Sequence, residues 1–285
     1  MSVHLDGSPC KVRCPFCYLG ARRDSELLSI SRRPSDRGEP QPAAQHPIAQ
    51  LVAAVEQLDY EELAIAVSEP VDEAAVLSLS AAAKARGRLV AITTTLEISV
   101  DYPSLLAHVG RLNLSVDAWK IEGDAAQMLA AVEHAARTAR STNPALEIIA
   151  IATLATPSFA ELLVDGGLLV ALNESQYLDG VALSALKPPP PFCDRAFWLR
   201  TMSTLRPLLD RALDKRLFLD CYVAARLLGL GGCPGRADLS PTANGRIAFR
   251  SCVYAQTPDL EVATAKDVPA AYVAPTECPF DTRLA

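Results

Sequence analysis

The sequence has no apolar run long enough to cross a membrane. The longest apolar stretch, residues 148–155, has only the length of a β-strand and borders the charged Glu147, whereas a membrane-spanning helix needs about 20 apolar residues. The first residues also lack the basic region and apolar stretch that together mark a secretory signal. We therefore expect no membrane partner and a cytoplasmic location.

Clustered basic residues are scarce as well. The 285-residue chain has 27 Lys and Arg against 33 Asp and Glu, which gives a formal net charge of −6. Proteins that grip nucleic acid need grouped Lys and Arg side chains, so the charge balance argues against a nucleic-acid partner. One basic stretch occurs at Arg22, Arg23, Arg32, Arg33 and Arg37. It is either a solvated loop or a site for a carboxylate, a phosphate or an electron-donor protein.

Eight cysteines stand out against this background. In a reducing compartment such residues are better suited as metal ligands than as disulfides. Cys10, Cys14 and Cys17 have the C-x₃-C-x₂-C spacing that holds a [4Fe–4S] cluster by three of its irons, and an open metal position can bind and activate a molecule. The motif predicts a catalytic iron–sulfur cluster. A zinc knuckle with His4 as its fourth ligand, or a set of buried thiols, remains the alternative.

The aromatic Phe16 precedes the last of these cysteines and Tyr18 follows it, and in this form the motif resembles the radical S-adenosylmethionine (SAM) enzymes. The resemblance implies a [4Fe–4S] cluster and SAM as cofactors, with Phe16 and Tyr18 beside them. It also implies that the reduced cluster cleaves SAM to a 5′-deoxyadenosyl radical, which abstracts hydrogen from a substrate. The implied electron donor is flavodoxin or ferredoxin.

Strand-like segments alternate with helical patterns over residues 1–215, which is the order of a parallel α/β barrel. Strands are expected at residues 2–6, 62–67, 89–94, 112–119, 146–154 and 180–186, and helices at 47–58, 73–86, from Asp124, at 159–169 and from Asp194 towards 213 with a kink at Pro207. We predict a partial (β/α)6 TIM-like barrel. Active sites of barrels lie at the carboxyl ends of their strands.

Polar residues occur at those strand ends. Ser68 and Glu69, followed by Pro70, are similar to the Gly-Gly-Glu-Pro segment that contacts the amino group of SAM in the family, although Val67 and Ser68 replace both glycines. A carboxylate at this place would accept a charge-assisted hydrogen bond from an ammonium group. The alternative for Glu69 is a solvent-exposed loop residue.

The third and fourth strands end in further polar residues. Thr93 and Thr95 close the third strand, and alternation places Ser115 and Asp117 on one side of the fourth. These groups resemble those that line the ribose and methionine sites of SAM in the family. Thr153 on the fifth strand is another predicted cofactor contact, and Ser184 and Lys187 on the sixth are weaker candidates.

Residues 216–285 form a predicted extension. The Asn244-Gly245 pair lies between two strand-like segments and predicts a hairpin, with Cys233 and Cys252 on its two sides. This arrangement resembles the Twitch or SPASM extensions, and it implies a possible auxiliary [4Fe–4S] cluster with Cys221, Cys233, Cys252 and Cys278 as ligands. The cysteine count excludes a two-cluster SPASM domain, and buried thiols remain the alternative. Cys193 has no assigned role: a ligand, a catalytic thiol and a surface residue all remain open.

The sequence predicts an enzyme but leaves its substrate undecided. We expect a radical SAM enzyme that oxidises or rearranges a small metabolite, because peptide-modifying relatives often carry a leader-binding domain and this chain begins almost directly at the first strand. One alternative is a peptide-modifying radical SAM enzyme that acts on a ribosomal precursor peptide. A non-catalytic iron–sulfur or zinc scaffold is the other.

Overall fold

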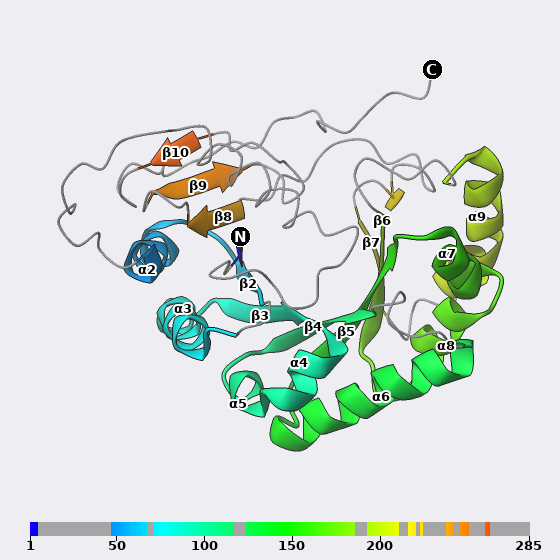
Figure 1. The fold of residues 1–285 in the computed structure, drawn as a ribbon, viewed down its shortest axis with the longest axis horizontal. Coiled ribbons are helices and arrows are strands. Elements are labelled where there is room, and N and C mark those ends of the chain that lie inside the picture. The colour runs from blue at the N-terminus through cyan, green and yellow to red at the C-terminus, as the bar shows by residue number, and fades with distance from the viewer. Residues whose placement is uncertain are drawn as a thin grey trace, which may run out of the picture. The chain divides into compact units, whose positions relative to one another are not determined.

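A computed structural model describes a large part of the chain in two compact units (Figure 1). The described residues are 1–4, 47–67, 71–116, 124–185, 193–210, 216–220, 223–224, 238–241, 246–250 and 260–262. Unit 1 consists of Met1–Val90 and Gly235–Pro275, and unit 2 of Ala91–Pro234 and Thr276–Ala285. The predicted boundary between residues 215 and 216 stays a prediction.

Unit 1 contains a mixed sheet with strand order β10-β9-β8-β1-β2. Its strands are β1 (Ser2–His4), β2 (Glu62–Ala66), β8 (Asp238–Pro241), β9 (Ile247–Arg250) and β10 (Leu260–Val262), and its helices are α2 (Pro47–Gln57) and α3 (Glu73–Ala85). β1 runs parallel to both β2 and β8, whereas β8, β9 and β10 are antiparallel to one another. The side chain of Asp72 caps α3 by accepting a hydrogen bond from Ala75 N–H at 3.0 Å.

The hairpin predicted from Asn244-Gly245 is confirmed. β8 and β9 pair in antiparallel register, with Pro241 opposite Ile247 at the end nearest the turn. Leu239 and Phe249 face each other in the same ladder and are fully buried. The apolar pair holds the hairpin to the rest of unit 1, because a buried Leu or Phe side chain contributes about 1.5–3 kcal/mol.

Unit 2 is built on a parallel sheet. The order is β3 (Leu89–Thr94, of which Ala91–Thr94 lies in unit 2), β4 (Arg111–Val116), β5 (Glu147–Leu154), β6 (Gly180–Ala185) and β7 (Arg216–Leu219). The helices are α4 (Leu96–Asp101), α5 (Pro103–Leu106), α6 (Ala125–Thr142), α7 (Pro157–Val164), α8 (Leu168–Glu174) and α9 (Arg195–Asp210). Strands β1 to β6 thus alternate with helices as predicted, and the fold is parallel α/β of the partial TIM-like barrel class.

The two faces of the sheet in unit 2 differ in polarity. Helices α4, α7 and α8 pack against β4, β5 and β6, and one side chain in every two along these strands is apolar and buried. The buried set includes Leu112, Leu114, Val116, Ile148, Ala150, Ala152, Leu154, Val181, Leu183 and Ala185. Because side chains alternate between the faces of a strand, the residues between them lie on the opposite face, away from these helices.

The helix predicted over residues 159–169 is wrong in one respect, because the structure has two shorter helices there. The chain breaks at Gly167, whose φ of 74° is the left-handed conformation that favours glycine. The neighbouring Gly166 comes close to the preceding turn, so that a Cβ there would lie 2.6 Å from the Leu162 carbonyl oxygen. The two glycines therefore end α7 and let α8 begin in a new direction.

The remaining differences concern short elements. α4 and α5 follow β3 where no helix is predicted.

Other helices begin or continue as predicted. α6 begins directly after Asp124, whose side chain accepts a hydrogen bond from Gln127 N–H at 2.9 Å, as expected for its N-cap. α9 retains Pro207 inside the helix. Within the described part of the chain, no helix has the length and apolar character needed to cross a membrane.

Candidate functional site

Polar side chains gather on one face of the unit 2 sheet, near the carboxyl ends of its strands. The register pairs Thr93 with Asn113, Ser115 with Ile151, and Thr153 with Ser184. Residues paired across parallel strands point to the same face, and these positions alternate with the buried apolar set. We call this group the polar face; it consists of Thr93, Asn113, Ser115, Thr153, Ser184 and Asp220.

Thr93 and Asn113 form a hydrogen-bonded pair on the polar face. The side-chain amide nitrogen of Asn113 donates to Thr93 Oγ1 at 3.2 Å, and both side chains are half-buried. The Asn113 amide oxygen is a second polar atom in the same place, because an amide group has both donors and an acceptor. The pair therefore offers neutral hydrogen-bonding groups without a net charge, which suits a ligand with hydroxyl groups.

Asp220 closes the polar face at the end of β7. Its carboxylate accepts hydrogen bonds from Ser184 Oγ at 2.8 Å, from Ala185 N–H at 2.9 Å and from Val223 N–H at 2.7 Å. Its own N–H donates to the Leu183 carbonyl oxygen at 3.0 Å. Asp220 thus ties the ends of β6 and β7 together and fixes the orientation of the Ser184 hydroxyl group.

Several predicted cofactor contacts are now placed in the fold. Thr93, Ser115 and Thr153 come from three adjacent strands and lie on the polar face together with Ser184. Thr95 directly follows β3, is half-buried, and its carbonyl oxygen accepts a hydrogen bond from Ser99 N–H at 3.3 Å in α4. The structure places these side chains, and their role as SAM contacts stays a prediction.

Other predicted site residues lie outside the described residues. They are Cys10, Cys14, Phe16, Cys17, Tyr18, Ser68, Glu69, Asp117, Lys187, Cys221, Cys233, Cys252 and Cys278. Among the residues that are described, no group of three His, Cys, Asp or Glu side chains is arranged to hold a metal ion. The prediction of the two iron–sulfur clusters therefore rests on the sequence motifs.

Sequence reasoning missed Asn113 and Asp220. Asn113 is two residues before Ser115 in Arg-Leu-Asn-Leu-Ser-Val, so strand alternation assigns both to one face. Asp220 follows the strand-like Arg-Leu-Phe-Leu directly, which is the same strand-end position that drew attention to the other polar residues. Both residues could have been found by extending that strand-end rule along β4 and to β7.

Cys193 lies immediately before α9 and is half-buried. Burial, and in second place the negative charge of Asp194, raise the pKa of its thiol to about 11. A thiol with so high a pKa is protonated at neutral pH, whereas nucleophilic and metal-binding cysteines act as thiolates. Its backbone carbonyl oxygen accepts a hydrogen bond from Trp198 Nε1 at 2.8 Å. The surroundings of Cys193 therefore favour a structural role for this residue over a role as a nucleophile or metal ligand.

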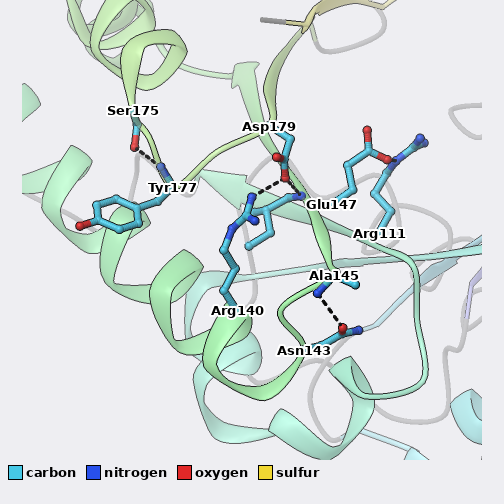
Figure 2. Close-up of polar contacts among 9 residues, drawn as sticks. Arg111, Arg140, Asn143, Ala145, Glu147, Ser175, Tyr177 and Asp179 are labelled. Carbon is cyan, nitrogen blue, oxygen red and sulfur yellow. Dashed lines mark hydrogen bonds and ion pairs between the residues drawn. The ribbon is translucent and has the colours of Figure 1, made fainter.

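The opposite, amino-terminal end of the same sheet holds charged pairs (Figure 2). Arg111 Nε and Glu147 Oε2, on paired positions of β4 and β5, lie 2.7 Å apart. Asp179 Oδ2 accepts hydrogen bonds from Arg140 Nη2 at 2.6 Å and from Ile148 N–H at 2.7 Å. These contacts join α6, β5 and the start of β6 to one another.

Asn143 completes this end of the sheet. Its side-chain nitrogen donates to the carbonyl oxygens of Leu106 at 2.9 Å and Val109 at 3.1 Å. Its side-chain oxygen accepts from Ala145 N–H at 3.2 Å, as Figure 2 shows. The amide group thereby pairs backbone groups of the turns before β4 and β5. Since active sites of barrels lie at the carboxyl ends of their strands, we assign the candidate site to that end.

The fold and the polar face define a parallel α/β protein with its candidate site at the carboxyl edge of the sheet. No model of a known protein family matches the sequence, and no curated protein matches it. Solved structures do share the fold. SuiB of Streptococcus suis bound to its precursor peptide SuiA has a TM-score of 0.54 and 12% sequence identity, over 94% of this chain and 65% of SuiB.

SuiB bound to S-adenosylmethionine gives a TM-score of 0.56 and 13% identity, over 94% of this chain and 64% of SuiB. This chain therefore spans just under two thirds of the length of SuiB. At these identities the similarity shows that the two proteins share a fold.

Proposed function

We propose that this protein is a radical SAM enzyme. The observation that supports this most directly is the polar face at the carboxyl edge of a fold shared with SuiB, a protein whose structure was solved with S-adenosylmethionine bound. The C-x₃-C-x₂-C motif of Cys10, Cys14 and Cys17 adds the ligands for a [4Fe–4S] cluster. Together the cluster and SAM supply, when bound, an electron and a 5′-deoxyadenosyl radical for hydrogen abstraction.

In this proposal the polar face supplies hydrogen-bonding groups for SAM. Thr93 and Asn113 supply neutral donors and acceptors for the ribose hydroxyl groups, and Ser115 and Thr153 lie next along the same face. Ser184, oriented by Asp220, supplies a further hydroxyl group. In the proposal Glu69 accepts a hydrogen bond from the amino group of SAM, and Ser68, Thr95 and Asp117 complete the contacts.

The proposed substrate is a ribosomally made precursor peptide. SuiB was solved with its precursor peptide SuiA bound, and this similarity supports a peptide substrate better than the small metabolite expected from the sequence. A non-catalytic scaffold would not need a row of hydroxyl and amide groups on one face of its sheet. The proposed electron donor remains flavodoxin or ferredoxin, in the cytoplasm.

An auxiliary [4Fe–4S] cluster is a further part of the proposal. Its ligands would be Cys221, Cys233, Cys252 and Cys278. The confirmed hairpin of β8 and β9 lies between Cys233 and Cys252 in the sequence, which is the arrangement that led to the prediction. Such a cluster would accept an electron from a substrate radical and so favour an oxidised product.

Anaerobic reconstitution with iron and sulfide, followed by addition of SAM and a reductant, tests the proposal. We expect about four irons per chain for one cluster or about eight for two, together with formation of 5′-deoxyadenosine. Cys14→Ala should abolish 5′-deoxyadenosine formation, while the matched variant Cys193→Ala should retain it. Bound zinc, or a full cluster that forms no 5′-deoxyadenosine, would leave the scaffold as the better assignment.

A further inference from the structure

Helix α9 (Figure 1) carries arginines and apolar side chains on one side, several of them exposed. Another side packs against the rest of unit 2 through Phe197, Trp198, Thr201 and Leu205, which are buried. The exposed side presents Arg195, Leu199, Met202 and Arg206 at spacings of four, three and four residues. Such spacings place side chains in one stripe along a helix. We call these four residues the α9 stripe.

Leu199, at the centre of the α9 stripe, is more exposed than is usual for a leucine. Leu199 is 62% exposed, whereas most Leu side chains of this protein lie in the core. Met202 beside it is partly buried, and Arg195 and Arg206 at the two ends are exposed. The arginine Cα atoms are separated by about 16 Å, from the rise of 1.5 Å per residue in an α-helix. An apolar centre with a cation at each end is typical of a binding surface.

Among the residues that the structure describes, neither Arg195 nor Arg206 has an ion-pair partner, whereas Arg200 on the flank of the helix lies 3.8 Å from Asp165. Arg195 also occupies the first turn of α9, where the helix dipole disfavours a cation. Its charge therefore does not stabilise the helix, and it stands out on a chain with a net charge of −6.

The α9 stripe is connected to the candidate site by the chain topology. β6 and β7 are parallel neighbours, and α9 lies between them in the sequence, so the three form a βαβ unit. The helix of such a unit starts at the edge where its first strand ends. Arg195 therefore lies towards the carboxyl edge, on which the polar face is found, and Arg206 lies farther from it.

We propose that the α9 stripe binds an acidic segment of the peptide substrate. The inference rests on the proposed function, because it takes the substrate to be a peptide. Carboxylate groups of the segment pair with Arg195 and Arg206, and an apolar residue between them covers Leu199 and Met202. Charge complementarity of this kind gives a partner its orientation and raises its association rate. A segment held here is anchored at a distance from the reacting part of the same peptide.

A fluorescein-labelled peptide of about twelve residues, with Glu at both ends and Leu in the centre, provides a direct test. Its binding to the full-length reconstituted protein is followed by fluorescence anisotropy, and a peptide with Lys in place of Glu serves as the control. We expect the acidic peptide to bind and its affinity to fall with rising salt concentration. The Lys peptide should not bind detectably.

Variants locate the binding surface. Arg195→Glu and Arg206→Glu should each weaken binding of the acidic peptide by about tenfold, since each replaces an attraction by a repulsion. Leu199→Ser should weaken it by about threefold. Lys84→Glu, which makes the same charge change at an exposed position of α3 in unit 1, should leave binding unchanged. All four variants should form 5′-deoxyadenosine as the unaltered protein does.

The proposal is overturned if the acidic peptide fails to bind, binds no better than the Lys peptide, or responds to Lys84→Glu as strongly as to Arg195→Glu. It is also overturned if the protein dimerises and Leu199→Ser abolishes the dimer, because a second copy would then cover the stripe. Failure of the proposed function is separate, since it would appear as absent 5′-deoxyadenosine whatever the peptide does.

Discussion

The two ends of the unit 2 sheet use polar residues in different ways. At the amino-terminal end, Arg111, Glu147, Arg140 and Asp179 form ion pairs, and their partners are protein groups. At the carboxyl end the polar face is made mostly of hydroxyl and amide groups, with side-chain hydrogen bonds from Asn113 to Thr93 and from Ser184 to Asp220. The contacts at the amino-terminal end hold helices and strands to one another, whereas the carboxyl end is the candidate site that we propose for SAM.

The largest expected effect is a loss of stability, without a loss of SAM binding, from a substitution at the amino-terminal end of the sheet. Asp179→Ala removes the acceptor for both Arg140 and Ile148 N–H, so we expect the free energy of unfolding to fall by about 2 kcal/mol. The affinity for SAM should not change. Urea unfolding and a SAM titration measure the two quantities.

Asp165→Ala is the matched control for that prediction. Asp165 also faces an arginine, but at 3.8 Å and with both side chains 52% exposed. Exposed ion pairs of this kind contribute about 0–1 kcal/mol. If Asp165→Ala lowered stability as much as Asp179→Ala, the contacts of Asp179 in Figure 2 would stabilise the fold no more than an exposed ion pair does.

A pair of asparagine variants compares the two ends directly. Asn143→Ala leaves the carbonyl oxygens of Leu106 and Val109 without their donor, so it should lower stability by about 1–2 kcal/mol and leave SAM affinity intact. Asn113→Ala should instead weaken SAM binding by about fivefold, which corresponds to about 1 kcal/mol. If both variants changed the same quantity, the division between the ends would be wrong.

A substitution on β5 should have a smaller effect on SAM affinity, and it tests the polar face at Thr153. Thr153→Val keeps the shape of the side chain and removes its hydroxyl group, and we expect SAM to bind about threefold more weakly. Thr138→Val, on the exposed side of α6, makes the same change and removes only a hydrogen bond to the His134 carbonyl oxygen. SAM affinity should be unaffected there, and an equal loss in the two variants would count against Thr153 as a contact.

A separate test concerns pH. Burial raises the pKa of the Cys193 thiol to about 11, so its neutral form is favoured in the folded protein. The neutral thiol therefore stabilises the folded protein. This contribution is complete below the ordinary thiol pKa of about 8.5 and is lost as pH rises towards 11. Cys193→Ala should therefore flatten the decline of thermal stability in this range. An unchanged slope would mean that the thiol ionises as it does in the unfolded chain.

Strand alternation and turn chemistry were sufficient to predict much of this fold. The hairpin follows from Asn244-Gly245, and the order of βα units follows from the alternating patterns. The break at Gly167 was missed although the Gly166-Gly167 pair is itself a turn signal, because apolar residues at helical spacing stand on both sides of it. Short α4 offers too few residues for a periodic pattern.

The candidate site was predicted less completely than the fold. Thr93, Ser115 and Thr153 stand at strand ends, and their shared face follows from the register. Asp220 could not be recognised as a link between two strands, because its bond to Ser184 joins residues 36 positions apart. Such a contact depends on the parallel pairing of β6 and β7, which no local pattern reveals.

The pairing of β1 with β8 has a consequence for how the chain folds. Val3 lies opposite Leu239, so two residues near opposite ends of the sequence are neighbours in one ladder. Distant pairs are slow to form because loop closure precedes the contact, and during synthesis the amino-terminal strand emerges long before its partner. The middle of the chain can therefore fold first, while β1 keeps one edge unpaired. A ribosome-stalled chain that ends before residue 238 should expose this edge to proteases and chaperones.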